Sequence, residues 1–148
     1  MSEIFQGGCY CGDVRFEVAN IFDAGYCHCS ICRRFGGGPV SAWANTPVEA
    51  FRVTRGSPSR FASSENWERY FCSRCGCGLF GKYRQPPQEV PNLVSFGIFN
   101  LDTPEAIAPA AHIWHSSKVA YFETSDELPR FSEGTLTHHD KRKSWRAV

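Results

Sequence analysis

A chain of 148 residues can form one domain that buries roughly two thirds of its unfolded surface, so its core does not need disulfides. The 16 basic and 15 acidic residues leave a net charge of +1, which gives no electrostatic basis for binding nucleic acid or a membrane surface. No stretch reaches transmembrane length, and residues 1–8 lack the basic and apolar regions of a secretory signal, so we expect a cytoplasmic protein with a small or neutral partner.

The sequence predicts a mainly β fold, because 13 glycines, 9 prolines and 12 phenylalanines are scattered along it without any long helical periodicity. Alternating apolar and polar residues predict strands at 14–18, 40–44 and 51–53. Residues Trp67–Phe71 are expected to form a strand that delivers Cys72 at its end, and the apolar run 93–99 to form another. Four aromatic side chains are expected in the core: Trp43, Trp67, Phe96 and Phe99.

Helix is predicted to be sparse. Ser30 is a candidate N-cap for a turn or two over residues 31–35, which Gly36 would end. A second short piece over 103–107 has Pro104 at its first position, where the missing N–H of proline costs no hydrogen bond.

No linker or internal repeat interrupts residues 3–131, so we expect a single domain at 1–132. Residues 133–148 are predicted to form a C-terminal tail, more simply a solvated segment than a binding arm. This tail holds His138, His139 and the basic run Lys141, Arg142 and Lys143.

Seven of the eight cysteines fall into three tight clusters with metal-ligand spacing, and the eighth follows the last cluster: Cys9-x-Cys11, Cys27-x-Cys29-x2-Cys32, Cys72-x2-Cys75 and Cys77. Tetrahedral zinc with bonds of about 2.3 Å needs sulfurs just under roughly 4 Å apart, which short spacings supply. In a reducing cytosol the thiols stay free for metal, so the clusters predict zinc rather than disulfides.

A Cys-x-Cys segment and a Cys-x2-Cys knuckle each supply half of a closed zinc site. Residues i and i+2 of an extended or hairpin segment place Cys9 and Cys11 on one side. Gly76 relieves crowding after Cys72 and Cys75, so that backbone N–H groups can turn toward the thiolates. A lone Cys-x2-Cys can be a buried pair or a redox dithiol, but the matching Cys-x-Cys favours structural zinc.

Cys27, Cys29 and Cys32 offer three thiolates within six residues and leave the fourth position of a tetrahedron open. Three candidates compete for it: Cys77, a histidine (His28, His112 or His115), or water and substrate. Two closed four-cysteine sites would use all eight cysteines. Adjacent side chains diverge in an extended segment, so His28 is expected beside the ligand shell or at the surface.

The charge of this second cluster favours one kind of ligand. Three thiolates on Zn²⁺ leave a net charge of about −1, so the ion is a weaker Lewis acid than one bound by neutral histidines. Such a site suits a fourth thiol, deprotonated and held as a nucleophile, better than hydrolysis. Arg33 and Arg34 either offset the thiolate charge, hold a substrate carboxylate, or are ordinary exposed residues.

Several segments together resemble the glutathione-dependent formaldehyde-activating enzyme family, whose type member is called S-(hydroxymethyl)glutathione synthase and which includes centromere protein V. The matching residues are GCYCGDVRF at 8–16, YCHCSICRR at 26–34, FCSRCG at 71–76, HIW at 112–114 and LPRF at 128–131. The resemblance covers about residues 5–131. It implies an all-β tent of zinc-pinned sheets, related to the fold of methionine sulfoxide reductase B.

The resemblance also implies a division of the cysteines and a reaction. Residues Cys9, Cys11, Cys72 and Cys75 match the family's structural zinc ligands, and Cys27, Cys29 and Cys32 match those of its catalytic zinc. The implied reaction is the reversible addition of a small thiol, glutathione in the type enzyme, to formaldehyde or a similar aldehyde, which makes the protein a carbon–sulfur lyase. Cys77 stands where the family commonly has a residue other than cysteine. It is expected to be either a small buried side chain or a metal ligand or redox group.

Two other functions are compatible with parts of the pattern. A zinc-binding interaction module of the same fold would bind partners without turnover, and would have four protein ligands on each zinc. A sulfoxide reductase would need a redox cysteine late in the chain, and no cysteine follows Cys77. His112, Trp114 and His115 match a family motif, so one of them lines the pocket or His112 is a hydrogen-bonded core histidine.

Overall fold

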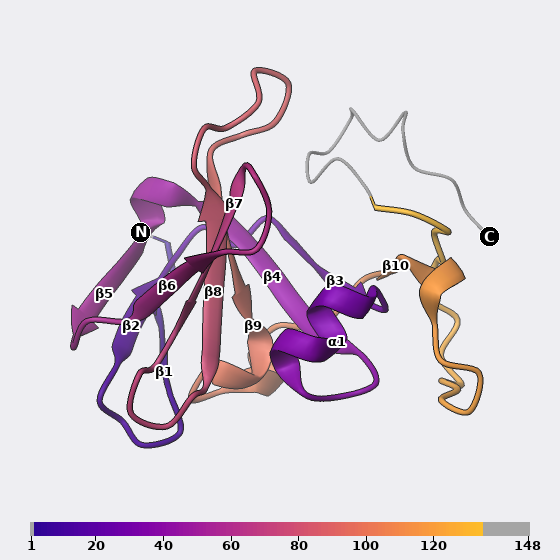
Figure 1. The fold of residues 1–148 in the computed structure, drawn as a ribbon, viewed down its shortest axis with the longest axis horizontal. Helices are drawn as coiled ribbons and strands as arrows, with labels where there is room; N and C mark the ends of the chain where they lie inside the picture. Colours follow the sequence, from indigo (N-terminus) through magenta and orange to yellow (C-terminus); the bar gives the residue numbers. More distant parts are fainter. Residues whose placement is uncertain (1, 135–148) are drawn as a thin grey trace.

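The computed structural model describes residues 2–134, and Figure 1 shows its ribbon. Of the predicted tail, only Glu133 and Gly134 are described, so the boundary after residue 132 stays a prediction. His138, His139 and the basic run 141–143 lie outside the described residues. No helix between residues 2 and 134 is long and apolar enough to cross a membrane.

The described chain is mainly β, as predicted, and its strands alternate with short helical turns. The strands are β1 (Phe5–Gly8), β2 (Arg15–Val18), β3 (Asp23–Cys27), β4 (Ser41–Pro47), β5 (Phe51–Arg55), β6 (Ser59–Ala62), β7 (Trp67–Phe71), β8 (Gly78–Tyr83), β9 (Leu93–Gly97) and β10 (His112–Ile113). The helical pieces are α1 (Ser30–Gly36) and the 3₁₀ turns η1 (Val48–Ala50), η2 (Ile98–Asn100), η3 (Pro104–Ala106) and η4 (His115–Ser117).

These strands form a small and a large sheet. The small sheet has the order β1-β2-β5, and the large one the order β10-β3-β4-β9-β8-β7-β6. Neighbouring strands are antiparallel except β10, which runs parallel to β3. In Figure 1 the small sheet and α1 lie toward opposite sides of the large sheet, with α1 and β10 near the end of β3.

Aromatic rings fill the space between the two sheets. Phe16 of β2 stacks on Phe51 of β5 with ring centres 5.0 Å apart, and Phe51 lies 4.6 Å from Phe80 of β8. The ring centre of Phe96 of β9 lies 6.0 Å from that of Phe16, and both residues are 1% exposed. This contact joins the small sheet to one face of the large sheet and leaves the other face free for a pocket.

The predicted strands are confirmed with small shifts of their ends, but the strand predicted at 93–99 stops at Gly97. The chain then turns through η2, which points Phe99 outward with 74% of its surface exposed. The prediction that Phe99 lies in the core is therefore wrong, whereas Trp43 and Phe96 are buried and Trp67 is half-buried. Five strands were not predicted from the sequence: β1, β3, β6, β8 and β10.

The two predicted helical pieces are present, but the capping residues of α1 differ by one position. The N-cap is Cys29 rather than Ser30, because the Cys29 sulfur accepts the backbone N–H of Cys32 at 3.3 Å. Gly36 is the last residue of the helix, and the residue that caps its end is Gly37, with a φ of 72° in the left-handed region. The second piece is η3, and Pro104 is its first residue as expected.

We predict that Phe96→Ala lowers the free energy of unfolding by about 3–5 kcal/mol, because it leaves a cavity between the two sheets. The matched control is Phe99→Ala, three residues along the chain and exposed, which should change the free energy by no more than about 0.5 kcal/mol. Denaturant unfolding of the metal-replete protein measures both values. Equal losses from the two substitutions would contradict the packing described here.

Candidate metal centre

Four cysteines from two hairpin loops meet at one point between the sheets. Cys9 and Cys11 lie in the loop between β1 and β2, and Cys72 and Cys75 in the loop between β7 and β8. All four sulfurs lie within 4.8 Å of one another, with Cys9 and Cys11 3.6 Å apart and Cys11 and Cys72 3.8 Å apart. A tetrahedron with zinc–sulfur bonds of about 2.3 Å has sulfurs roughly 3.8 Å apart, so this four-cysteine cluster fits the ion.

Local backbone geometry shapes this four-cysteine cluster. Gly76 has a φ of 76°, which favours glycine, and its N–H donates to the Cys72 carbonyl at 2.8 Å to close the turn. The backbone N–H of Val14 donates to the Cys9 sulfur at 3.3 Å. Backbone N–H groups of Cys77 and Cys11 also lower the pKa of Cys75 to about 6. The turns therefore favour thiolates, which are the form that binds metal.

The second group, the Cys27–Cys29–Cys32 triad, is built where β3 runs into α1. Cys27 is the last residue of β3, Cys29 caps α1, and Cys32 lies in the first turn of that helix. Their sulfurs also lie within 4.8 Å of one another. The sequence interpretation therefore grouped the seven cysteines as the structure brings them together, in sets of four and three.

The three sulfurs of the triad share protons. Hydrogen bonds from the thiols of Cys27 and Cys32 lower the pKa of Cys29, and the N–H of Cys32 acts in the same direction. Hydrogen bonds to Cys29 and Cys32 and burial raise the pKa of Cys27. Three thiols at this spacing cannot all ionise without a cation among them, so the donor set suits a metal ion.

No fourth ligand atom from a cysteine, histidine or carboxylate within residues 2–134 joins the triad group. Cys77 directly precedes β8 and is half-buried, and its sulfur accepts an N–H of the Asn100 side-chain amide at 3.2 Å. The histidines proposed for the fourth position, His28, His112 and His115, are also outside the group. Within the described residues, therefore, neither Cys77 nor any of these three histidines takes the fourth position beside the triad.

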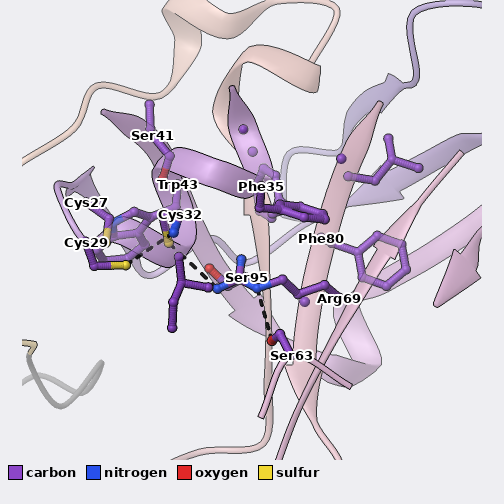
Figure 2. A pocket seen from close by; sticks show the side chains of 18 of the residues that line it. Cys27, Cys29, Cys32, Phe35, Ser41, Trp43, Ser63, Arg69, Phe80 and Ser95 are labelled. Atoms are coloured by element: carbon purple, nitrogen blue, oxygen red, sulfur yellow. Dashed lines mark hydrogen bonds between the residues drawn. The ribbon is translucent and has the colours of Figure 1, made fainter. Parts of the chain in front are cut away.

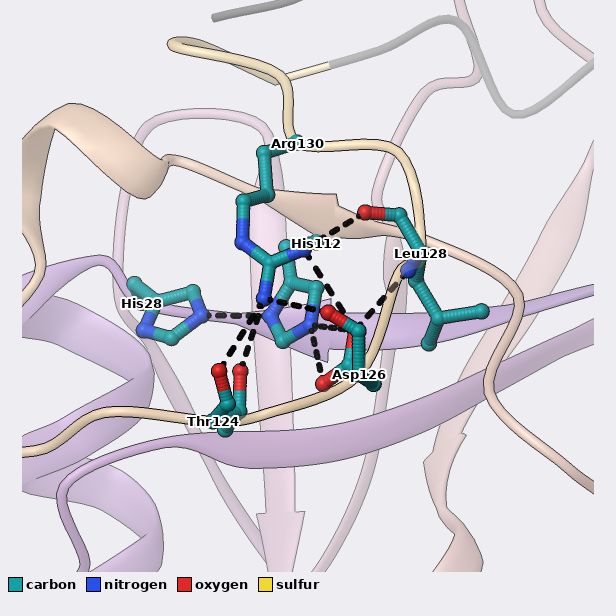
Figure 3. Close-up of polar contacts among 6 residues, drawn as sticks. All are labelled: His28, His112, Thr124, Asp126, Leu128 and Arg130. Carbon is teal, nitrogen blue, oxygen red and sulfur yellow. Dashed lines mark hydrogen bonds and ion pairs between the residues drawn. The ribbon is translucent and has the colours of Figure 1, made fainter.

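His28 and His112 form a buried network with Asp126 (Figure 3). His28 Nε2 lies 2.8 Å from His112 Nδ1, and His112 Nε2 lies 3.0 Å from Asp126. His28 is 1% exposed and His112 is fully buried, so the surface alternative for His28 is wrong and the core alternative for His112 is confirmed. Burial, together with nearby His112, lowers the pKa of His28 to about 4, so it is neutral at pH 7.

This network fixes the segment after residue 123 against the strand that ends in Cys27. The backbone N–H of Leu128 and the ring of His112 hold the pKa of Asp126 below its usual range, although burial opposes them. Arg130 lies 3.5 Å from Asp126 and donates to the carbonyl of Leu128 and the hydroxyl of Thr124. The carboxylate–histidine–histidine chain therefore supports the loop that carries the triad without entering its ligand set.

Among the arginines near the triad, the sequence interpretation singled out two and missed a third. Arg33 donates to the backbone carbonyls of His28 and Ser117, so it ties loops together, and Arg34 is exposed. Arg69 of β7 has its Nη2 3.8 Å from the Cys32 sulfur, and its Nε donates to Ser63 at 3.1 Å. Only the register of the strands brings Arg69 to the triad, 37 residues after Cys32.

The triad opens into a pocket of about 860 Å³ on the face of the large sheet away from the core (Figure 2). Its lining includes the triad, Phe35, Trp43 and Arg69, and the exposed Trp114 lies on its wall. The guanidinium of Arg69 also lies over the ring of Phe35, 5.1 Å from its centre. Pockets of about 300–1,000 Å³ hold small organic ligands, so this one has room for more than a one-carbon aldehyde.

Comparison with known proteins places the fold and the cysteine loops in one family. The family model described as glutathione-dependent formaldehyde-activating enzyme matches residues 4–117. A "Putative glutathione-dependent formaldehyde-activating enzyme" of Halomonas elongata is 34% identical over 88 residues, 52% of this chain and 55% of that protein. An uncharacterized lyase of Schizosaccharomyces pombe is 30% identical over 88 residues, 53% of this chain and 58% of that protein.

The matched part of each curated relative is thus little more than half of its length. A crystal structure of a Rhodobacter sphaeroides protein aligns with a TM-score of 0.55 and 25% identity, over 70% of this chain and 91% of that one. The family model itself spans all seven cysteines of the two groups. The chain therefore belongs to the glutathione-dependent formaldehyde-activating enzyme family.

Proposed function

We propose that the protein is a zinc-dependent carbon–sulfur lyase that adds a small thiol, such as glutathione, reversibly to formaldehyde or a similar aldehyde. The observation that carries this proposal is the triad: three cysteine sulfurs within 4.8 Å at the edge of a pocket, with no fourth protein ligand from residues 2–134. An open position is typical of catalytic zinc, and a closed set of four ligands is typical of structural zinc. The family and the names of the relatives support the same reaction class.

The two clusters have different tasks in this proposal. The four-cysteine cluster joins the β1–β2 loop of the small sheet to the β7–β8 loop of the large one, so zinc there is structural. Cys27, Cys29 and Cys32 would hold the catalytic zinc, which supplies deprotonation of an incoming thiol and a fixed position for its sulfur. Reduced thiols are required throughout, so the proposal includes a cytoplasmic location.

The chain's own residues prepare the pocket for this addition. Arg69 places a positive charge beside Cys32 and so offsets part of the negative charge of the triad. The rings of Phe35 and Trp43 line the pocket and make part of its wall apolar.

The reaction balances without an oxidant or reductant. The thiol loses its proton to solvent, and its sulfur forms a bond to the carbonyl carbon while the carbon–oxygen π bond breaks. The oxygen then takes a proton from solvent to give a hydroxymethyl thioether. The reverse sequence breaks the carbon–sulfur bond, which is the lyase direction. Holding sulfur and carbonyl together in one pocket converts a bimolecular encounter into a local one.

We predict that Cys29→Ala and Cys72→Ala damage the protein in different ways. Cys29→Ala should retain the fold and lose one of two zinc ions, because the triad lies at the edge of the pocket. Cys72→Ala should unfold or aggregate, because metal binding at a structural site contributes directly to folding. Metal quantification and circular dichroism of the purified variants measure both effects.

Cys77→Ala is the matched control and should keep both zinc ions, since Cys77 belongs to neither group. Equal loss of fold in Cys29→Ala and Cys72→Ala would contradict the assignment of one structural and one catalytic zinc site. Loss of zinc in Cys77→Ala would assign that cysteine to a metal site.

We also predict that the wild-type protein accelerates the exchange between a thiol and formaldehyde. Nuclear magnetic resonance exchange spectroscopy with glutathione and formaldehyde measures the rate directly. Cys29→Ala should lower the rate at least ~100-fold, because even residues that only support metal ligands contribute 10–100-fold. If the wild-type protein carries both zinc ions and no thiol exchanges faster than in buffer, the zinc-binding interaction module becomes the better description.

A further inference from the structure

Three large apolar side chains of the pocket lining are exposed to solvent. Phe99 is 74% exposed, Ile31 50% and Trp114 40%, and all three line the pocket into which the triad opens. Arg69 is the only charged side chain of this lining in the part of the chain that the structure describes. Single exposed apolar residues are ordinary, whereas a group of them around one cavity is typical of a ligand site. We call these three side chains the apolar rim.

The backbone places the apolar rim beside the triad. Ile31 lies in the first turn of α1, between the second and third cysteines of the triad. Trp114 directly follows β10, whose Ile113 pairs with the triad residue Cys27. Phe99 lies in η2, which contacts β4, the strand next to β3. A molecule whose reactive end lies at the triad can therefore extend along the apolar rim.

Trp114 is held in a backbone conformation that bulky residues rarely adopt. Its φ is 54°, in the left-handed region that favours glycine. Its backbone N–H donates to the Glu133 carbonyl at 3.1 Å, and the N–H of His115 donates to the Phe131 carbonyl at 3.0 Å. A Cβ on Gly134 would lie 2.9 Å from the indole nitrogen, so the chain there packs closely against the ring. Backbone strain is concentrated at functional sites, which indicates that the position of this ring matters.

The charged and the apolar parts of the pocket lining come from opposite sides of β3, the strand that ends in the triad. Arg69 belongs to β7, whereas Trp114 follows β10, and β3 lies between these two strands in the large sheet. The polar thiol of the proposed function is matched by the charged side. Formaldehyde has no carbon beyond its carbonyl, so it would leave the apolar rim without a partner. The apolar rim therefore indicates a second reactant that carries an apolar group.

We propose that the aldehyde substrate carries a hydrocarbon group of several carbons, and that Trp114, Phe99 and Ile31 bind this group while the carbonyl lies at the triad. The three side chains then determine which aldehyde is used. Each buried methylene strengthens binding about fourfold, so a short chain is enough for selection. The bond changes are those given for formaldehyde, and they need no oxidant or reductant. The assignment rests on the proposed function for the reaction, but binding of the hydrocarbon group does not require turnover.

The binding test uses 1-hexanol, which has the hydrocarbon chain but no reactive carbonyl. A nuclear magnetic resonance titration that follows the 1-hexanol signals measures its binding to the zinc-loaded protein, with ethanol as the baseline. The wild-type protein should bind 1-hexanol with millimolar affinity and should not bind ethanol measurably. Phe99→Ala and Trp114→Gly should each bind 1-hexanol about fivefold more weakly or worse. Tyr121→Ala is the matched control and should bind as the wild type does, because Tyr121 is exposed, aromatic and outside the pocket lining.

Rate measurements separate aldehyde selection from a structural role. Hexanal and acetaldehyde share the same reacting group, so the ratio of their kcat/KM values with one thiol reports on the added chain. With glutathione as the thiol, the wild-type ratio should favour hexanal at least about tenfold. Phe99→Ala and Trp114→Gly should each lower this ratio about fivefold and leave the acetaldehyde rate within about twofold of wild type. Both variants should fold, because Phe99 is exposed and glycine suits the φ of residue 114.

The assignment is overturned if 1-hexanol does not bind to wild type, if both rim variants bind it as wild type does, or if the variants lose equally with both aldehydes. It is also overturned if a second copy of the chain covers the apolar rim. Sedimentation would then show a dimer that Phe99→Ala dissociates, and 1-hexanol would not bind. Failure of the proposed function looks different, because 1-hexanol would still bind at the rim while no aldehyde reacts with a thiol faster than in buffer.

Discussion

The proposed function depends on the mutual electrostatics of three cysteine sulfurs at the end of β3. Cys27, Cys29 and Cys32 are close enough to share protons, and three thiolates in that space repel one another unless a cation lies among them. With Zn²⁺ bound as proposed, the triad would keep a net charge of about −1 and an open position. A thiol, which is soft and acidic enough to lose a proton, would suit that position better than water.

Three sets of contacts hold together the parts of the fold around this triad. The four-cysteine cluster joins loops of the two sheets, and the aromatic rings of Phe16, Phe51 and Phe80 pack between those sheets. On the opposite side, the hydrogen bonds from His28 through His112 to Asp126 attach the segment after residue 123 to the triad loop. The triad thus lies on a rigid support, while its pocket opens away from the core.

Local patterns were enough to predict the parts of the structure that depend on near neighbours. Alternation along residues 14–18 and 40–44 located two strands, and short cysteine spacings located the turns that bring sulfurs together. The assignment of four and three cysteines came from the family resemblance, because spacing alone allowed two closed sites. Phe99 was misplaced because the apolar run continues past Gly97 although the strand does not.

Features that depend on strand register could not be read from the sequence. Arg69 and Asn45 have no motif around them, and they share the pocket only because β7, β8, β9 and β4 are neighbours in the large sheet. His28 lies outside both cysteine groups, in keeping with the divergence of adjacent side chains in an extended segment. The burial of His28 could not be predicted without knowing that β10 pairs with β3 and places His112 beside it.

X-ray absorption at the zinc edge counts the sulfur atoms around the metal and so tests whether the triad leaves one position on its zinc open. With four and three cysteines on two ions, we expect an average of about 3.5 sulfurs per zinc in the thiol-free protein. Addition of glutathione should raise the average to about 4 as external sulfur joins the triad. An average of four sulfurs before any thiol is added, or no change after it, would rule out an open position at the triad.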